Sequence, residues 1–397
     1  MNYEFSKRIA AVQPSAIREI LKSTADPNVI SFAAGNPAPE AFPVKAIENI
    51  ISIIMGDSAI AALQYSVSEG YPALREATRS FALSREHGVA TIDDDLMIVS
   101  GAQQGIELTI KSLVNEGDTV LCESLSFVSA LNTIRSYGAN LVGVPLQSDG
   151  IDVDALEQAI VTNKNVKLLY TIPNFNNPTG ITMSLQKRQA VYDLCRKHHV
   201  IILEDNPYGD LRFSGSSIPA IKTLDTDGCV VYVGSFSKII APGLRVGYVI
   251  ANRGLMPKLV VAKQCSDVHT NILAQMVCER FLVSCNMSSH LLGLQKIYDA
   301  KATMMVNSLS DFCGGLLRWN APEGGLFLWC GLPAGVDMPR FCKAAASAGV
   351  AVVPGNAFLA EEAAPCDSFR INYSTPSNDQ IVRGTELLGN VLRSLLR

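Results

Sequence analysis

The sequence lacks the marks of a nucleic-acid-binding or membrane protein. Its 397 residues carry a net charge of −4, and no block of about five or six like charges occurs. The nearest approach is Asp93-Asp94-Asp95, which we interpret as a solvated turn. No stretch reaches the roughly 20 apolar residues of a membrane helix, and no signal-peptide core follows the early charges Glu4 and Lys7. We therefore expect a cytoplasmic protein with no nucleic-acid or membrane partner.

Paired cysteines are also missing. The ten cysteines are scattered, and none forms a C-x-x-C pair, so neither a zinc ribbon nor a dithiol motif is indicated. Several lie in apolar runs such as 229–232, where a thiol behaves as a small core side chain. We expect reduced cysteines and no metal. Core material is plentiful, because 48% of the residues are hydrophobic and only 18% are charged.

Short apolar runs alternate with longer amphipathic segments in the middle of the chain. The runs predict strands at 96–99, 119–122, 141–144, 166–172, 200–203, 229–233 and 247–251. Helices are expected between several of them, at about 102–115, 126–137, 152–162 and 184–198. Continuous apolar strands separated by helices predict an α/β fold with a mostly parallel sheet sandwiched by helices.

The two ends of the chain differ from the middle. The first 45 residues contain five prolines and predict an irregular arm with one short helix at about 15–23. After 314, Gly-rich turns separate short strands, and a terminal helix is expected at about 378–396. We therefore expect an N-terminal arm and short helix packing with the small domain, a large ligand-binding domain and a small C-terminal α+β domain, at 1–45, 46–290 and 291–397.

Polar residues follow two predicted strands where each ends, and ligands of open α/β sheets bind at such ends. Ser100-Gly101-Ala102-Gln103 comes after the strand at 96–99 and opens a helix. Its backbone N–H groups could hold an anion, and ordinary capping would look the same. A turn at 173–180 follows the strand at 166–172. There Asn177 either stabilises the turn or presents its amide to a ligand.

Two further strand ends carry charge. Glu204-Asp205-Asn206-Pro207-Tyr208 follows one strand, and a carboxylate at the end of a buried strand is costly without a partner. A protonated ring nitrogen fits better than a metal, whose further ligands are missing. Ser235-Phe236-Ser237-Lys238 follows the next strand, with Arg245 seven residues on. Two hydroxyls and a guanidinium could bind phosphate, and a lysine among cations could be a nucleophile. An exposed loop lysine is the alternative.

Phosphate donors, a lone carboxylate and a nucleophilic lysine at one sheet edge are the parts of a pyridoxal-phosphate (PLP) site. Asn-Pro-Thr-Gly at 177–180, Glu-Asp-Asn-Pro-Tyr at 204–208 and Ser-Phe-Ser-Lys at 235–238 stand in this order. In these motifs the chain resembles the fold-type I PLP enzymes of the aspartate aminotransferase superfamily, class I/II. It is most similar to the 2-aminoadipate, kynurenine and MocR-like aminotransferase group, nearly end to end. The large domain would then bind PLP.

The resemblance implies a role for each matching residue. Lys238, Asp205 and Tyr208 would be catalytic: Lys238 holds PLP as a Schiff base and moves the proton at the substrate Cα, and Asp205 keeps the pyridinium nitrogen protonated. Tyr208 and Asn177 would hydrogen-bond the ring hydroxyl oxygen. The phosphate and the ring face would be bound by the remaining cofactor residues, Ser100, Gly101, Ala102, Gln103, Ser235, Ser237, Arg245 and Phe127.

The resemblance also implies the substrate contacts and a dimer. Arg370 would bind the substrate α-carboxylate, with Asn177 beside it and the backbone of Gly35 against it. Arg18, on the predicted short helix, would either bind a distal carboxylate of the substrate or be an ordinary surface arginine. Tyr65 would reach the phosphate of the neighbouring subunit, which requires a homodimer with a shared active site.

One departure concerns Phe127, which stands where this group usually has tyrosine, so that stacking is kept and a hydroxyl is lost. The implied reaction is transamination between an amino acid and a 2-oxo acid, with 2-oxoglutarate and glutamate expected as one pair. β-Elimination by a C–S lyase would use the same residues and stays open. A MocR-type ligand sensor has less support, because the similarity begins within about the first 20 residues and leaves no room for a DNA-binding domain. The amino donor is not identified.

Overall fold

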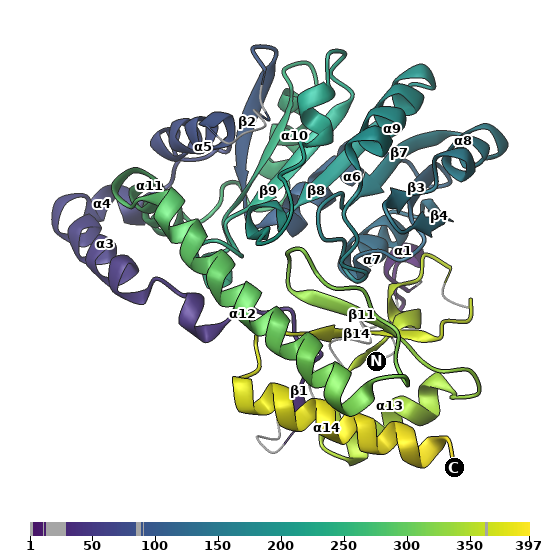
Figure 1. Ribbon diagram of the computed structural model, residues 1–397. Coiled ribbons are helices and arrows are strands. Elements are labelled where there is room, and N and C mark those ends of the chain that lie inside the picture. The colour runs from purple at the N-terminus through teal and green to yellow at the C-terminus, as the bar shows by residue number, and fades with distance from the viewer. Residues whose placement is uncertain (1–2, 11, 13–28, 85–88, 90, 362–363) are drawn as a thin grey trace.

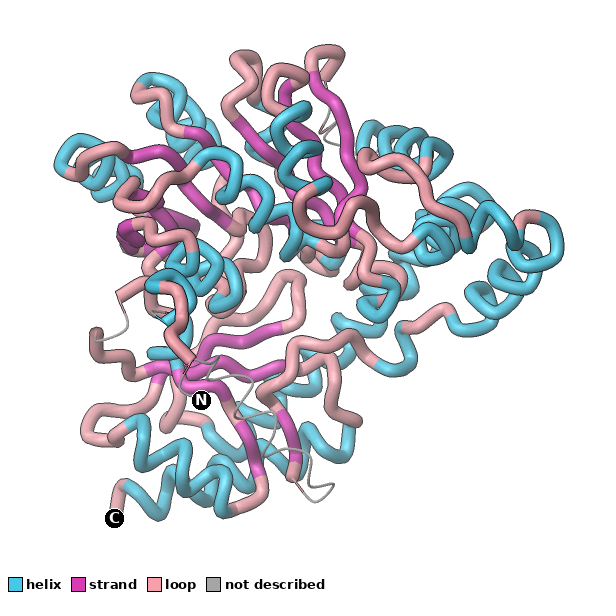
Figure 2. The backbone as a smooth tube through the Cα atoms, turned by 180° about the vertical axis from the view of Figure 1, so that it is seen from behind, coloured by secondary structure: helices cyan, strands magenta, loops and turns pink. Residues whose placement is uncertain are grey.

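The computed structural model describes residues 3–10, 12, 29–84, 89, 91–361 and 364–397. Figures 1 and 2 show a large sheet surrounded by helices and, beside it, a smaller α+β unit. The long helix α12 (Met287–Cys313) runs from one to the other. The predicted helix at 15–23, which includes Arg18, lies outside the described residues.

The large sheet has seven strands in the order β2-β10-β9-β8-β7-β3-β4. Their bounds, in that order, are Asp94–Val99, Gly247–Asn252, Val230–Ser235, Ile201–Asn206, Val166–Thr171, Thr119–Glu123 and Asn140–Val144. Strand β10 runs antiparallel to both of its neighbours, β2 and β9, and the other neighbouring pairs are parallel. Strands β3 and β9 are buried at every residue, as expected of parallel strands covered on both faces. The predicted α/β fold with a mostly parallel sheet is confirmed.

Four helices connect strands of this sheet close to their predicted positions, namely α6 (Ala102–Leu113), α7 (Val128–Ser136), α8 (Val153–Thr162) and α9 (Leu185–Lys197). Side-chain caps fix two of the starts. The Asp152 carboxylate accepts from the N–H of Ala155 before α8, and the Ser184 hydroxyl accepts from that of Lys187 before α9. Further helices of the large unit are α5 (Pro72–Ser84), α10 (Met256–Gln264) and α11 (Ile272–Ser284).

The smaller unit is built on a three-stranded antiparallel sheet in the order β11-β14-β13, with bounds Phe327–Gly331, Ser368–Asn372 and Val353–Pro354. Helices α13 (Met338–Ser347) and α14 (Asn378–Leu395) accompany it. Helix α14 begins with a capping box, in which Ser377 and Gln380 satisfy each other's backbone N–H groups, and it packs along α12. Strand β14 carries Arg370.

The described parts of the N-terminal arm contact both units. Helix α1 (Lys7–Ala10) lies against α7 of the large unit, whereas β1 (Ile30–Ser31) pairs in parallel with β12 (Val350–Ala351). Helices α3 (Val44–Asp57) and α4 (Ala59–Leu63) project to one side with α11 (Figure 1). The remaining short elements are β5, β6 and η1 to η5, at Leu146–Gln147, Gly150–Ile151, Pro39–Ala41, Gly209–Leu211, Ile221–Leu224, Pro242–Leu244 and Gly355–Phe358.

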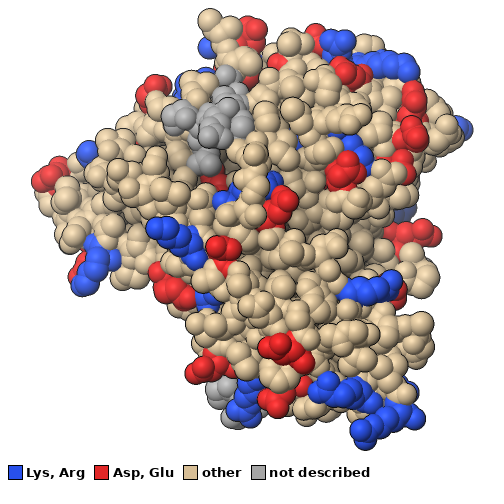
Figure 3. Space-filling model, viewed as in Figure 1, with Lys and Arg blue, Asp and Glu red and all other residues tan. Residues whose placement is uncertain are grey.

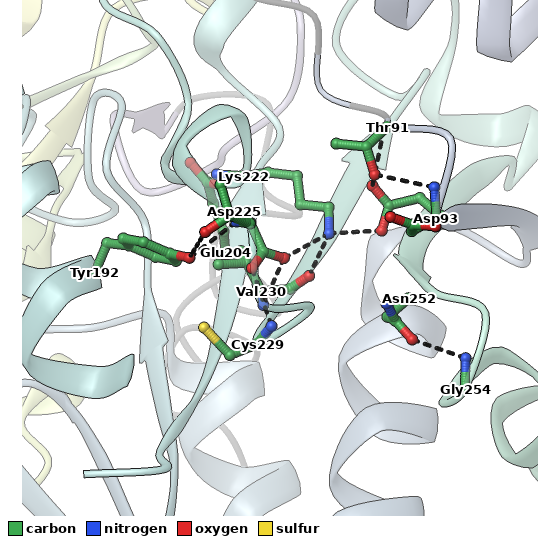
Figure 4. A network of polar contacts seen from close by, with 12 residues as sticks. Thr91, Asp93, Tyr192, Glu204, Lys222, Asp225, Cys229, Val230, Asn252 and Gly254 are labelled. Carbon is green, nitrogen blue, oxygen red and sulfur yellow. Dashed lines mark hydrogen bonds and ion pairs between the residues drawn. The ribbon is translucent and has the colours of Figure 1, made fainter. Parts of the chain in front are cut away.

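The interpretation of Asp93-Asp94-Asp95 as a solvated turn is wrong for Asp94. This residue opens β2, is 1% exposed and accepts a hydrogen bond of 2.8 Å from Lys222 Nζ. Lys222 Nζ also donates to Asp225 at 2.8 Å and to the carbonyl oxygen of Val230 at 3.0 Å (Figure 4). We call Asp94, Lys222 and Asp225 the Lys222 cluster. Because it joins residues far apart in the sequence, the local pattern of charges could not predict it.

Candidate active site

Lys238 lies just after β9, at the carboxyl edge of the large sheet. Its Nζ donates to the carbonyl oxygen of Gly35 at 2.8 Å. Burial lowers the pKa of Lys238 to about 8, and the charges of Arg245 and Arg370 add to the effect. A larger fraction of this amine is therefore neutral near pH 7 than in an ordinary lysine, which makes it a better nucleophile.

Asp205 lies in β8 and is 2% exposed. Its Oδ2 accepts a hydrogen bond of 2.8 Å from the Tyr170 hydroxyl. Its Oδ1 is buried and has no hydrogen-bond partner within the described residues. Burial raises the pKa of Asp205 to about 7, against the lowering effect of the Tyr170 bond. A buried oxygen left without a donor suits a ligand that brings its own N–H group.

Arg370 and Asn177 meet although they are 193 positions apart. Arg370 Nη1 donates to Asn177 Oδ1 and Nη2 donates to the carbonyl oxygen of Ala33, both at 2.7 Å. The guanidinium carbon lies 4.2 Å from the centre of the Phe327 ring and 4.9 Å from that of Phe358. Burial lowers the pKa of Arg370 to about 10. Its neighbours in the described part of the chain supply no carboxylate, so its charge is available to an anion.

The predicted phosphate-binding residues lie at the ends of two strands, β2 and β9. Gly101 precedes α6 with φ +80°, a backbone conformation that favours glycine. A Cβ atom there would also meet the guanidinium of Arg245, which would have to move. Arg245 donates to the carbonyl oxygens of Ser100 and Pro242 at 3.3 Å each. The Ser235 hydroxyl accepts from the N–H of Ser237 at 3.1 Å. These contacts bring the end of β2 and the end of β9 together through Arg245.

A single cavity of about 510 Å³ brings most of the predicted residues together. The predicted residues that line it are Gly35, Ala102, Gln103, Phe127, Asn177, Asp205, Tyr208, Ser235, Ser237, Lys238, Arg245 and Arg370. Burial raises the pKa of Tyr208, whose ring stands edge-on to Phe327 with centres 5.9 Å apart. Lysine, carboxylate and phosphate-type donors therefore face one space, as the strand ends predict.

Other predicted residues lie elsewhere. Ser100 and Gly101 do not line the cavity; the Ser100 hydroxyl donates to Asp267 at 2.7 Å instead. Tyr65 is 83% exposed and makes an edge-on ring contact with His269. Within one chain, Tyr65 therefore takes no part in this cavity.

Sequence reasoning missed three residues of this region. Tyr170 holds Asp205 from the neighbouring strand, and Glu123 is buried at the end of β3 beside the turn at 173–180. Phe327 lies against both Arg370 and Tyr208. A polar residue inside an apolar strand is the available signal for Tyr170 and Glu123, since each needs a buried partner. Phe327 offers no such signal.

The described residues contain no group of three or more His, Cys, Asp or Glu side chains placed to hold a metal ion. None of their helices is long and apolar enough to cross a membrane.

Comparison with known proteins places these features in a family. The family model described as "Aminotransferase class I and II" matches residues 27–386. Aromatic-amino-acid aminotransferase 1 of Thermococcus litoralis is 35% identical, with 100% of this chain and 96% of that protein covered. The 2-aminoadipate transaminase of Thermus thermophilus is 34% identical, with 99% and 97% covered.

A solved structure agrees with the sequence comparison. The kynurenine aminotransferase of Pyrococcus horikoshii, in complex with PMP, superposes with a TM-score of 0.94 at 35% identity, with 99% of this chain and 98% of that chain covered. The cavity fits PLP, because Asp205 offers an unpartnered oxygen to the ring nitrogen and Lys238 offers an amine. The chain belongs to the class I and II aminotransferases and is a PLP-dependent transaminase.

Proposed function

We propose that this cavity exchanges the amino group between an amino acid and a 2-oxo acid, with glutamate and 2-oxoglutarate as one pair. The observation that carries the assignment is that Lys238 and Asp205 line the same cavity, while Oδ1 of Asp205 has no hydrogen-bond partner within the described residues. PLP, when bound, supplies an electron sink for the charge that develops at the substrate Cα. Lys238 would hold the cofactor through its amine, and would afterwards carry the proton from the substrate Cα to the C4′ atom of the cofactor.

The cofactor contacts follow from what each side chain has to offer. Asp205 would hold a protonated ring nitrogen, since a buried carboxylate needs a cation or a donor. Asn177 and Tyr208 supply hydrogen-bonding groups for the ring hydroxyl, and Phe127 an aromatic face for the ring. The phosphate would be bound by backbone N–H groups, hydroxyls and a guanidinium, from Ala102, Gln103, Ser235, Ser237 and Arg245. Ser100 and Gly101 would only shape the start of α6, because their N–H groups already donate to Gln104 Oε1 and to the carbonyl oxygen of Val99.

Arg370 would bind the substrate carboxylate. A guanidinium has five N–H donors, and two of its nitrogens are already directed by Asn177 and Ala33. Its Nε is buried without a partner in the described part of the chain. The Arg370 side chain is therefore fixed in orientation while donors remain for a ligand. The backbone of Gly35 lines the same cavity, and its carbonyl oxygen accepts from Lys238 Nζ.

We propose a homodimer in which Tyr65 reaches the phosphate of the partner subunit. Tyr65 follows the projecting helices α3 and α4, whose exposed apolar side chains include Ile53, Ile60 and Leu63. Ile60 is 80% exposed, and a cluster of such side chains indicates an interface. Sedimentation as a dimer is expected. Mixing Tyr65→Ala with Lys238→Ala subunits should restore activity, because hybrid dimers contain one intact site. Sedimentation as a monomer would contradict the shared site.

A cytoplasmic location also belongs to the proposal. All ten cysteines are free thiols, which fits a reducing compartment. On the face seen in Figure 3, acidic and basic side chains are intermixed, without a broad basic field of the kind that attracts nucleic acid.

A screen of amino donors against 2-oxoglutarate tests the function. The relatives' names suggest aromatic amino acids, 2-aminoadipate and kynurenine as the first donors, and Phe127 and Phe327 give the cavity an apolar lining. Formation of glutamate is the expected result. Release of ammonia and pyruvate from cysteine, without exchange of amino groups, would identify a lyase instead. Arg18→Ala should raise KM for 2-aminoadipate more than for phenylalanine if Arg18 binds a distal carboxylate.

A further inference from the structure

Glu123 is a buried acid that the proposed mechanism does not use. It ends β3, is 1% exposed and does not line the cavity. Its Oε1 accepts from the Thr171 hydroxyl at 2.5 Å and from the N–H of Ile172 at 3.1 Å. Its Oε2 accepts from Asn176 Nδ2 at 3.2 Å. All three donors belong to the end of β7 and the turn after it, so one carboxylate ties this turn to β3.

Asn176 passes this restraint on to the rest of the turn. While its Nδ2 donates to Glu123, its Oδ1 accepts from the hydroxyl of Thr179 at 2.8 Å and from the N–H of Thr179 at 3.2 Å. Its backbone N–H donates to Ile181 and its carbonyl oxygen accepts from Gly180. Asn177 is the next residue, and its Oδ1 accepts from Arg370. The direction in which Asn177 points therefore depends on a turn that Glu123 restrains.

We propose that Glu123 is a positioning residue, which holds the turn at 173–180 so that the Asn177 amide faces both the cofactor ring and Arg370. This inference rests on the proposed role of Asn177 in binding the cofactor and orienting the substrate-binding arginine.

A carboxylate suits this position better than an amide of the same shape. Both oxygens of Glu123 receive donors, and an ionised carboxylate accepts at both, whereas a glutamine accepts at only one and would set an NH₂ group against a donor. Burial raises the pKa of Glu123 to about 7, and the bonds from Thr171 and Ile172 oppose this rise. An apolar side chain would fill this position without the free-energy cost of burying a charge, so packing alone does not account for a glutamate.

The test is a double-mutant cycle of Glu123→Gln and Asn177→Ala in the full-length enzyme. The readouts are the dissociation constant of PLP, measured by titrating the apoprotein, and KM against kcat for glutamate. We expect Glu123→Gln to weaken PLP binding and to raise KM about three- to tenfold, the loss of roughly one buried hydrogen bond. In the Asn177→Ala background the same substitution should change either value less than about twofold, because the residue through which it acts is gone.

Asp94→Asn is the matched control. Asp94 is also 1% exposed and also accepts from a threonine hydroxyl, a backbone N–H group and a side-chain nitrogen, but at the opposite edge of the sheet. The Asp94→Asn substitution should lower the melting temperature and leave PLP affinity and KM unchanged within about twofold. Should Glu123→Gln fail to fold, Asn176→Ala breaks the same link from the other side and must show the same loss and the same non-additivity.

The outcomes separate this inference from the proposed function. If Asn177→Ala weakens PLP binding and Glu123→Gln does not, Glu123 is only a structural anchor. If the two substitutions are additive, Glu123 acts by another route, and the inference again fails. If Asn177→Ala itself changes neither PLP affinity nor KM, the proposed role of Asn177 is wrong and the inference falls with it.

Discussion

The two edges of the seven-stranded sheet each hold a lysine, and the two lysines differ in their partners. Lys222 is fully buried and Lys238 is partly buried. At the amino edge, Lys222 Nζ donates to two carboxylates and one carbonyl oxygen, at 2.8 to 3.0 Å (Figure 4). At the carboxyl edge, Lys238 Nζ donates to the carbonyl oxygen of Gly35, and cations rather than carboxylates lie near it. The charge of the Lys222 amine is balanced by carboxylates, whereas the Lys238 amine remains available to react.

The acids of the two edges differ in the same way. Both oxygens of Asp225 accept hydrogen bonds, from Lys222 and from the N–H groups of Cys229 and Val230. Asp205, by contrast, has a buried oxygen without a partner in the described part of the chain. Buried polar groups are normally satisfied, so an unsatisfied acid that lines the same cavity as a lysine of lowered pKa indicates where a ligand completes the structure. The contrast teaches that burial of charge alone does not identify a site.

Among substitutions at the two edges, the largest effect on activity is expected from Lys238→Ala. Without the amine, the visible absorbance band of the lysine-bound cofactor should disappear, and kcat should fall at least about a thousandfold, since the proton carrier at Cα is lost. The free energy of unfolding of the apoprotein should not decrease, because Lys238 neutralises no carboxylate. Absorbance spectra, steady-state kinetics and urea unfolding measure these three quantities. A retained band would refute the assignment of the lysine.

Lys222→Met should reverse this pattern. Methionine fills a similar volume but leaves Asp94 and Asp225 buried without their cation, and breaking a buried ion pair costs about 3–5 kcal/mol. We expect that loss in urea unfolding, with kcat and KM of the folded enzyme unchanged. A fall in kcat of more than about threefold for folded Lys222→Met would show instead that the two edges are coupled.

Local patterns predicted the sheet and much of the site, and they failed where partners are distant. Apolar runs located all seven strands of the large sheet, and the helix expected at 184–198 is observed at Leu185–Lys197, because buried strands and capped helices are encoded by neighbouring residues. The strand-end rule selected Lys238, Asp205 and Asn177, which share one cavity.

Pairing across the sheet was beyond such patterns. Nothing near Asp94 indicates Lys222, which is 128 positions away, so the acidic run by itself indicates a turn. Tyr170 holds Asp205 from the adjacent strand, and that contact depends on the order of strands in the sheet. Ser100 is a related case. It follows a strand, as a ligand-binding residue would, but its hydroxyl donates to Asp267 outside the cavity. Sequence gives the candidates, and topology decides their partners.

The smallest of these effects, and the one with an unusual sign, is expected from Asp205→Asn in the apoprotein. The folded pKa of Asp205 is raised from 3.8 to about 7, so between these values the folded chain keeps a proton that the unfolded chain releases. This acid therefore lowers stability as the pH rises from about 4 to 7, and its effect is constant above that. Because one pKa unit corresponds to about 1.4 kcal/mol, asparagine should stabilise the apoprotein at pH 8 by no more than about 4 kcal/mol.

Asp225→Asn is the matched control for this substitution. An asparagine in place of Asp205 would still accept from Tyr170 and lose only an unpartnered oxygen. An asparagine in place of Asp225 would lose an acceptor that Lys222 and backbone N–H groups use. Urea unfolding of both variants between about pH 4.5 and 8 should thus give a gain that grows with pH for Asp205→Asn and a loss for Asp225→Asn. Asp205→Asn should also lose most of its activity. A loss of stability in both variants would mean that the Asp205 carboxylate, like that of Asp225, is fully hydrogen-bonded in the apoprotein. The active site would then not lower the free energy of unfolding.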